Sequence, residues 1–593
     1  MTSNRLALVA ALLLALACGE LRRPENAAPR ANLVSSNALR SDYAGSGQCH
    51  DCHAEIWQRW LTSPMHRMTR DAASAEIRAP FAGEALRFRN DVATLETHEG
   101  RRYLKLSAAD GSTRHYLVTK VIGGRYREDF AGIEVSGTRA GAASFGDERL
   151  LPVSYLIFDK SLRYKGYSVM SPERPALKPG ARWRTTCIFC HNTLPAFSSL
   201  FDELYGAGAP VYQGSASFEL PEARRFRFSV IDQAALENAV SAELAFLGWD
   251  AAPATGSSTA LLGSAIRATQ KRFTENHLIE LGVGCESCHG GAREHLRDPR
   301  RKPSFEMRSD FVAIAAPGGS VPTHAQDVNR TCAKCHTVLF TRYPYTWEGK
   351  RRNSDPGGSH INSGEARDFL LGGCSTELHC ASCHDPHGNG EQASAEAVAD
   401  GVCARCHASE AAPERRAAHT HHAAGSEGSR CVNCHMPQKN MGLGYDLVRY
   451  HRIGSPTDRE RVEGDRPLEC ALCHADRSVE ALVGTMERWW GKRYNRRALQ
   501  ELYGPDLRVD ALDASLRRGK PHEQAVAIAM IGKQRLSARA PLLVEALDNE
   551  FPLVRFYTKA ALERVLGAPP PIDWHAPGPE LVEQGRRWLE AAR

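Results

Sequence analysis

The chain combines segments with a regular hydrophobic period and segments in which no period is present. Between residues 86 and 119, apolar and polar residues alternate in short runs, separated by turn sequences such as Glu99–Gly100 and Asp110–Gly111. Alternation with a period of two is typical of strands with one buried face. The runs are Leu86–Asn90, Val92–Thr97, Tyr103–Ser107 and Arg114–Thr119. They predict an antiparallel meander, which belongs to a β-rich insert that we place at residues 86–180.

The C-terminal part of the chain has a helical period instead. His522–Lys533, Ala540–Asp548 and Pro552–Leu566 read as amphipathic helices joined by short turns, and no cysteine follows residue 476. Pairs of helices with this spacing are typical of HEAT-type repeats. We therefore expect a helical HEAT-like domain over residues 477–593.

A repeated cysteine pattern runs through the segments with little periodicity. Eight Cys-x-x-Cys-His motifs use sixteen of the 18 cysteines and leave only Cys18 and Cys374. With 18 Cys and 24 His in 593 residues, random placement would give roughly 0.02 such motifs. In chain order, motifs one to eight are Cys49–Cys52–His53, Cys187–Cys190–His191, Cys285–Cys288–His289, Cys332–Cys335–His336, Cys380–Cys383–His384, Cys403–Cys406–His407, Cys431–Cys434–His435 and Cys470–Cys473–His474.

This spacing predicts covalent attachment of heme c. Two cysteines three positions apart can form thioethers with the two vinyl groups of a heme, and the next histidine then lies under the iron as its proximal ligand. Zinc is an alternative, but the histidine directly after every pair disfavours it. A disulfide framework does not fit a repeated three-residue spacing in so long a chain. We expect eight covalent hemes, with the histidine of each motif as an iron ligand.

The spacing of the motifs also indicates how the chain is organised. Successive proximal histidines His384, His407, His435 and His474 are only 23, 28 and 39 residues apart. Segments this short cannot build separate cores, so the hemes themselves must form the core. We predict a mainly α fold with much irregular heme-wrapping structure, a β-rich insert between motifs one and two, and C-terminal α-helical HEAT-like repeats. The expected divisions are a signal peptide (1–18), a linker (19–42), a first heme segment (43–85), the β-rich insert (86–180), a second heme and linking segment (181–284), a multiheme domain (285–476) and the helical domain (477–593).

The N-terminus reads as a secretory signal. Arg5 precedes an apolar run from Leu6 to Ala17, which has the length of a signal-peptide core and is too short to span a bilayer. Cys18 follows directly, which suggests lipid attachment at this residue after cleavage. An ordinary signal cleaved nearby, with Cys18 removed, is the alternative. We expect an exported protein, periplasmic or on the outer cell surface, with possible attachment to a membrane surface through the lipid anchor.

Several motifs, with their flanking residues, resemble the cytochrome c-554 family. The likeness begins with Trp57, Trp60 and Ser63-x-x-His66 after motif one. It continues with Gly284 to Gly290 around motif three, His-Asp-Pro-His in motif five and Cys-Val-Asn-Cys-His-Met-Pro in motif seven. It covers roughly residues 43–70 and 187–480, and the same signatures recur in a wider superfamily. That superfamily includes hydroxylamine oxidoreductase, the octaheme nitrite and tetrathionate reductases and pentaheme nitrite reductase. The resemblance implies closely stacked hemes that are mostly ligated by two histidines.

One departure concerns the superfamily's enzymes. All eight motifs end in His, whereas pentaheme nitrite reductases typically have Lys in the motif of the active heme. Hydroxylamine oxidoreductases bind a tyrosine covalently to theirs; Tyr494 and Tyr503 follow motif eight, but nothing around them singles either out. A lysine from elsewhere could ligate one iron, as in the tetrathionate reductases, and the sequence names no position.

The distal ligands decide the function, because a sixth strong ligand gives an electron-transfer heme and an open position permits chemistry. Sixteen histidines remain beyond the motifs, and the resemblance places several of them as distal ligands. These candidates are His66, His295, His387, His419 with His421 and His422, and His451. Weaker candidates are His277, His324, His360 and His379. Not expected as ligands are His50, His98, His115, His522, His575 and Met436.

Two functions follow, and the sequence leaves both open. The first is an electron carrier that exchanges electrons with redox partner proteins, supported by the dense motifs and the supply of histidines. The second is an oxidoreductase that acts on a small nitrogen or sulfur compound (nitrite, hydroxylamine or tetrathionate) at one open heme. Motif two, which lacks an obvious nearby distal histidine, is the candidate for that site. The net charge of +6 is nearly balanced and gives no indication of nucleic-acid binding.

Overall fold

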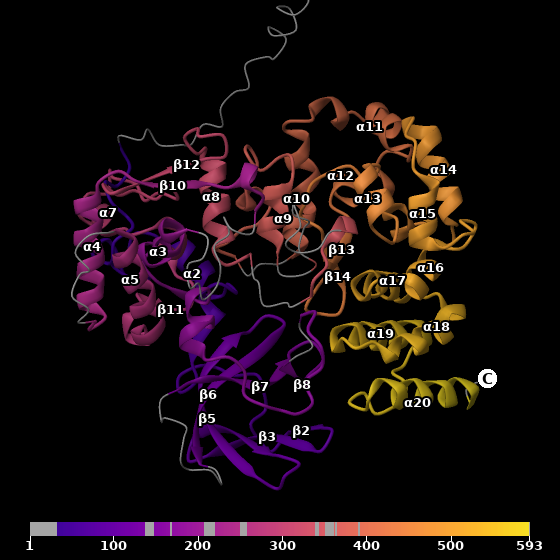
Figure 1. The fold of residues 1–593 in the computed structure, drawn as a ribbon, viewed down its shortest axis with the longest axis horizontal. Helices are drawn as coiled ribbons and strands as arrows, with labels where there is room; N and C mark the ends of the chain where they lie inside the picture. Colours follow the sequence, from indigo (N-terminus) through magenta and orange to yellow (C-terminus); the bar gives the residue numbers. More distant parts are fainter. Residues whose placement is uncertain are drawn as a thin grey trace, which may run out of the picture.

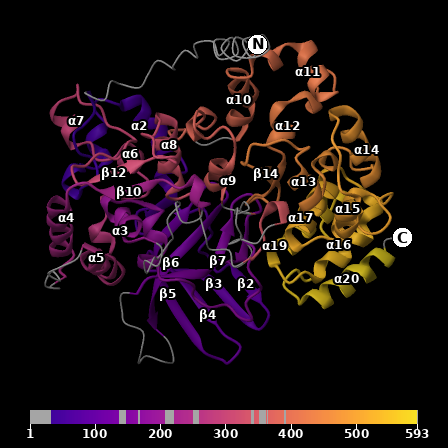
Figure 2. The same cartoon turned by 45° about the horizontal axis from the view of Figure 1, so that its top comes forward.

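The computed structural model describes residues 32–136, 147–165, 169–206, 220–249, 258–337, 343–349, 361, 364–388 and 392–591. The expected signal peptide, Cys18 and His360 lie outside these residues. Figures 1 and 2 show a sheet, a body of short helices and loops that carries the motifs, and a stack of helices at the C-terminal end.

Eight strands form one antiparallel sheet between motifs one and two. Its order is β2-β3-β4-β5-β6-β7-β8, and β1 pairs with β5. The strands are β1 (Thr69–Asp71), β2 (Ala85–Phe88), β3 (Asp91–His98), β4 (Arg101–Ser107), β5 (Thr113–Gly123), β6 (Arg127–Ser136), β7 (Arg149–Leu156) and β8 (Ser161–Tyr164). Leu95 lies opposite Leu104 in the register of β3 and β4, and both are fully buried. Alternate residues therefore face the core, as the sequence pattern requires.

Seven helices follow motif eight. They are α14 (Val479–Trp490), α15 (Arg496–Tyr503), α16 (Ala511–Arg518), α17 (Pro521–Lys533), α18 (Ala540–Glu545), α19 (Pro552–Leu566) and α20 (Gly578–Ala591). Helix α17 packs between α16 and α19 and is buried along almost its whole length. A Cβ atom on Gly532 would lie 2.7 Å from the Cα of Ala561, so this glycine permits the close approach of α17 and α19. The HEAT-like assignment stays a prediction.

Short helices and turns form the body that carries the motifs. Its helices are α2 (Ala54–Leu61), α3 (Phe197–Tyr205), α4 (Gln233–Phe246), α5 (Ser258–Arg272), α6 (Cys285–His289), α7 (Arg293–Arg297), α8 (His324–Ala333), α9 (Glu365–Leu371), α10 (Gln392–Ala404), α11 (Pro413–Thr420), α12 (Cys431–His435) and α13 (Arg459–Gly464). Its strands pair as β9 (Asn192–Thr193) with β11 (Glu280–Leu281), β10 (Arg227–Val230) with β12 (Val312–Ala315), and β13 (Gln438–Met441) with β14 (Leu447–Arg449).

The described part of the expected linker is folded. Val34 and Ala38 are fully buried. The side-chain amide of Asn37 donates hydrogen bonds to the backbone oxygens of Ser304 (3.1 Å) and Glu306 (2.9 Å). Residues 32–42 therefore belong to the body, because their few apolar side chains fill a space beside residues 293–308.

Among the described residues, no helix combines the length and the apolar character that a membrane span requires.

Candidate heme-binding sites

Every motif forms a single tight turn. In motif one the backbone N–H of His53 donates to the backbone oxygen of Cys49 (3.0 Å), and motifs two, four, five, six and eight repeat this bond at 3.0 to 3.1 Å. Motifs three and seven are the short helices α6 and α12. One turn of chain brings both sulfur atoms and the imidazole to the same side, as two thioethers and an iron bond to one heme require.

Five of the eight proximal histidines face a second histidine across a narrow gap. In each pair the ring planes are within 30° of parallel. A metal–imidazole bond is about 2 Å long, so two such bonds and two ring radii give a centroid separation of about 6 Å. The pairs are His53 with His295 (6.3 Å), His289 with His387 (6.1 Å), His384 with His451 (6.2 Å), His435 with His419 (6.1 Å) and His474 with His422 (6.0 Å).

Hydrogen bonds fix the orientation of four of these rings. Nδ1 of His295, His422, His435 and His451 lies 2.7 to 3.0 Å from a backbone carbonyl oxygen. Because a carbonyl only accepts, Nδ1 carries the proton and donates it, which leaves Nε2 as the free ligand atom. Burial also keeps proximal rings neutral, as ligation demands: it lowers the pKa of His289 to about 4. The residues present therefore fit iron between paired imidazoles.

The other candidates occupy different places. Within the described residues, His191, His336 and His407 of motifs two, four and six face no second histidine ring. His66 lies against Trp60, with ring centroids 4.3 Å apart, and its buried Nδ1 has no hydrogen-bond partner among the described residues.

Among the described residues, the remaining histidine candidates His277, His324, His379 and His421 also face no proximal histidine. His324 and His379 meet edge to face, with ring centroids 5.8 Å apart. Nδ1 of His277 accepts from the backbone N–H of Thr274, and His421 stacks on Trp489.

Four pairs of motifs approach each other through cysteine side chains, and three further pairs interact only electrostatically. Contact between Cys49 and Cys285 raises the pKa of Cys49 and lowers that of Cys285 to about 7. Weaker electrostatic interactions between cysteines link motif three to motif four, motif five to motif six, and motif seven to motif eight. The direct contacts are Cys49 with Cys285, Cys190 with Cys335, Cys332 with Cys380, and Cys403 with Cys431. The motifs thus follow one another in the order one, three, four, five, six, seven, eight, and motif two branches from motif four.

The contacts of motif two with motif four surround a cavity. Its walls include Phe189 and Cys190 of motif two, Lys334 and Cys335 of motif four, and Met307. The lining is mixed, because apolar side chains and cysteine sulfur atoms lie beside charged groups such as Lys334 and Arg330.

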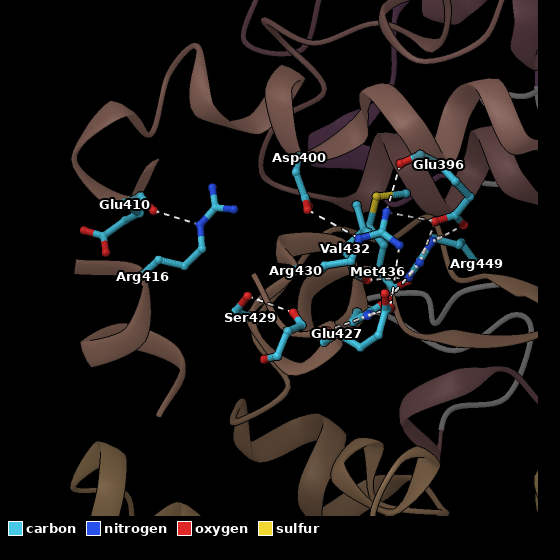
Figure 3. A network of polar contacts seen from close by, with 12 residues as sticks. Glu396, Asp400, Glu410, Arg416, Glu427, Ser429, Arg430, Val432, Met436 and Arg449 are labelled. Atoms are coloured by element: carbon cyan, nitrogen blue, oxygen red, sulfur yellow. Dashed lines mark hydrogen bonds and ion pairs between the residues drawn. The ribbon is translucent and has the colours of Figure 1, made fainter. Parts of the chain in front are cut away.

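Two arginines hold the turn of motif seven in place (Figure 3). Arg449 donates to the backbone oxygens of Val432 (2.7 Å) and Met436 (2.9 Å), and forms an ion pair with Glu396 (2.6 Å). Arg430 donates to the backbone oxygen of Glu396 (2.9 Å). Arg449 therefore satisfies carbonyl groups at the C-terminal end of α12, where a cation is also electrostatically favoured.

A buried ionic cluster lies beside motif two. Lys165 and Arg127 both contact the carboxylate of Asp129, the latter at 3.1 Å. Burial lowers the pKa of Lys165 to about 8, and Arg127 adds to this effect. Burial alone would raise the pKa of Asp129, but Arg127 and Lys165 outweigh it and hold that pKa at about 2. Burial, followed by Lys165, lowers the pKa of His191 to about 4. Motif two therefore has charged neighbours in place of a second imidazole.

A known family profile agrees with this chemistry. Residues 375–412, which hold motifs five and six, match the family profile described as the doubled CXXCH motif. Among solved structures, the chain is similar to the crystal structure of the outer cell wall cytochrome OcwA. The sequence identity is 13% and the TM-score 0.36, over 92% of this chain and 100% of that chain. No curated protein matches the chain. The attachment motifs and the doubled CXXCH match define a multiheme c-type cytochrome with covalently bound heme c.

Proposed function

We propose that this chain binds eight hemes and transfers electrons between redox partner proteins. The observation that carries the proposal is the set of five facing histidine pairs, whose spacing suits iron with two strong ligands. Covalently bound heme supplies reversible one-electron exchange when such ligands fill both axial positions. The protein's own part is to hold each imidazole neutral, oriented and shielded from water.

The contacts between motifs support a continuous route. Contacts or electrostatic interactions between cysteines link each motif of the series one, three, four, five, six, seven and eight to the next. No attachment site in the series is therefore isolated. Both ends of this series reach the surface, because Cys52 of motif one and Cys473 of motif eight are exposed; Cys406 of motif six is exposed as well. This arrangement suits entry of electrons at one end and exit at the other.

Electron paramagnetic resonance of the oxidised protein tests the histidine pairs. Replacing His295, His422 or His451 by Ala removes one distal imidazole, and each variant should convert one low-spin iron to a high-spin iron. His98→Ala is the matched control, since His98 is exposed at the end of β3. If the three variants keep the low-spin count of the unmodified protein, the pairs are not axial ligands.

The cluster at motif two favours a second function. A small anionic or polar nitrogen or sulfur compound, such as nitrite, hydroxylamine or tetrathionate, would meet Lys165 and Arg127 beside His191. In that reading Arg127 and Lys165 would orient the substrate, or Lys165 would ligate the iron as its neutral amine, while the remaining motifs would deliver electrons. Lys165→Met should then abolish turnover of the substrate and leave the five paired sites spectroscopically unchanged. A protein that turns over none of the three compounds and shows no high-spin iron excludes this function.

Export with lipid attachment at Cys18 remains part of the proposal. Mass spectrometry of the mature N-terminus distinguishes a lipidated Cys18 from a chain cleaved beyond it. Cys18→Ser should release the protein from the membrane fraction if the lipid is its anchor.

A further inference from the structure

A basic and aromatic surface lies at the C-terminal end of α14, next to motif eight. We define it by four exposed residues: Arg488, Trp489, Lys492 and Arg493. Residues 488–497 contain five basic side chains and no acidic one. Trp489 remains 41% exposed, which is uncommon for so large an apolar side chain.

The tryptophans of this surface contact the segment that supplies two facing histidines. Nε1 of Trp490 donates to the backbone oxygen of His419 (3.0 Å), and His419 faces the proximal histidine of motif seven. Trp489 meets His422 edge to face, with ring centroids 6.2 Å apart, and His422 faces the proximal histidine of motif eight. Helices α11 and α14 lie side by side in Figures 1 and 2. The surface therefore covers the end of the motif series.

Part of the charge of this surface is not neutralised by any carboxylate that the structure describes. Arg496 pairs with Glu487 (2.6 Å) and Arg497 with Glu501 (3.3 Å). Among the described residues, no carboxylate forms an ion pair with Arg488, Lys492 or Arg493. Three exposed cations thus lie in the same short segment as Trp489, where an acidic surface would find complementary charge.

We propose that Arg488, Trp489, Lys492 and Arg493 form the docking site of an acidic electron-transfer protein at motif eight. The proposal rests on the electron-transfer function proposed above and names the partner class and its place of contact. Trp489 supplies a rigid apolar centre, since one face already stacks on His421 with ring centroids 4.6 Å apart. The three cations form the polar rim that steers the partner. An anionic membrane surface is disfavoured because stacking on His421 holds Trp489 against the protein.

Stopped-flow reduction by an acidic one-electron donor tests the site. Reduced plant-type ferredoxin gives up one electron and becomes oxidised, and the cytochrome gains that electron. The triple variant Arg488→Gln, Lys492→Gln, Arg493→Gln should lower the second-order rate at low ionic strength by about fivefold or more, given the usual size of electrostatic steering. The salt dependence of the rate should flatten, and isothermal titration calorimetry should show weaker ferredoxin binding.

Matched controls separate this docking from general charge effects. Arg87→Gln, Arg101→Gln and Lys160→Gln remove three exposed cations from the sheet and should leave the ferredoxin rate unchanged. Hexaammineruthenium(II), a cationic donor, should react no more slowly with the docking variant than with the unmodified protein.

Four results would overturn the docking site. The first is that the unmodified protein does not react with ferredoxin, and the second is that the docking variant and the unmodified protein react with ferredoxin at equal rates. The third is that the docking and control variants lose equal amounts of the ferredoxin rate. The fourth is that the docking variant loses only its binding to phosphatidylglycerol vesicles, measured relative to phosphatidylcholine vesicles. Failure of dithionite to reduce the unmodified protein would instead refute the electron-transfer function itself.

Discussion

At the scale of single residues, the attachment chemistry is local and the distal chemistry is not. The two cysteines and the histidine of a motif share one turn, so their spacing alone predicts where heme is attached. His421 and His422 are adjacent, and the sequence does not say which one faces motif eight. His421 adopts a left-handed backbone conformation with φ of 57° at the end of α11. It therefore stacks on Trp489, while His422 turns toward His474.

Arg449 leads to a prediction at the same scale. Arg449→Met removes donors to the carbonyl groups of Val432 and Met436, and hydrogen bonds to charged groups contribute about 1.5–3 kcal/mol each. The variant should unfold at a lower temperature and show an altered low-spin signal from motif seven. Arg508→Met is the control, since Arg508 pairs with Asp506 on an exposed turn and exposed pairs contribute little. Equal midpoints of thermal unfolding for the two variants would contradict the proposed stabilisation of the motif-seven turn by Arg449.

At the scale of elements, a regular hydrophobic period locates individual strands and helices well. The run Val92–Thr97 lies inside β3, and Pro552–Leu566 coincides with α19. Residues 32–42 were expected in a linker because their composition is polar and rich in small residues. The few apolar side chains among them are nevertheless buried by distant residues that a local pattern does not reveal. His324 and His379 were expected as distal ligands, yet among the described residues neither faces a proximal histidine. This difference also depends on contacts between distant residues, which a local pattern does not reveal.

Buried charges attach helix α17 to the body. Arg466 of the body pairs with Glu523 of α17 (2.7 Å), next to a second pair within the body, Lys439 with Asp465 (2.5 Å). Nδ1 of His522 lies 2.9 Å from the hydroxyl of Tyr343. Asp465, His522 and Glu523 lie close enough together to hold a metal ion, but Lys439 and Arg466 already contact the two carboxyl groups. We therefore interpret this cluster as a structural join between the multiheme body and the C-terminal helices.

The join makes stability depend on pH. Burial raises the pKa of Asp465 from 3.8 to about 7, although Lys439 opposes the shift. The folded state binds this proton more tightly than the unfolded state does. The contribution of Asp465 to the free energy of unfolding is therefore complete below about pH 4 and is lost as the pH rises through 7. The shift corresponds to about 4 kcal/mol at most. Asp465→Asn cannot ionise, so its melting temperature should fall less between pH 5 and pH 8 than that of the unmodified protein.

An exposed aspartate provides the comparison. Asp506→Asn changes a carboxylate on an exposed turn and should leave the pH dependence of melting unaltered. Parallel curves for Asp465→Asn and the unmodified protein would show that Asp465 ionises freely in the folded state.

At the scale of the whole molecule, one apolar core joins parts that the sequence divides. Phe130 of the sheet, Leu472 beside motif eight and Ile528 of α17 belong to the same buried cluster. A second cluster packs α3, α4 and α5 near motif two. The predicted divisions follow the pattern of each segment, whereas the packing connects the sheet, the motifs and the C-terminal helices. Sequence patterns describe segments and do not contain the contacts between them.

The heme count is a prediction for the intact protein. Intact-mass spectrometry and the pyridine hemochrome assay should both give eight hemes per chain. Changing Cys470 and Cys473 to Ser should lower the count to seven, because motif eight loses both thioethers. Cys374→Ser should keep it at eight, because Cys374 belongs to no motif. Fewer than eight hemes in the fully matured, unmodified protein would show that some motif is not an attachment site.

The sulfur contacts between motifs have a consequence for how the protein is made. Cys49 touches Cys285, and Cys403 touches Cys431, although each cysteine must join its own heme. If the protein is exported as proposed, and if the chain folded before the hemes were attached, free thiols of different motifs would meet in an oxidising compartment and cross-link. Such bonds would block both attachment sites at once. Maturation must therefore keep the thiols reduced and load the hemes before the chain closes around them.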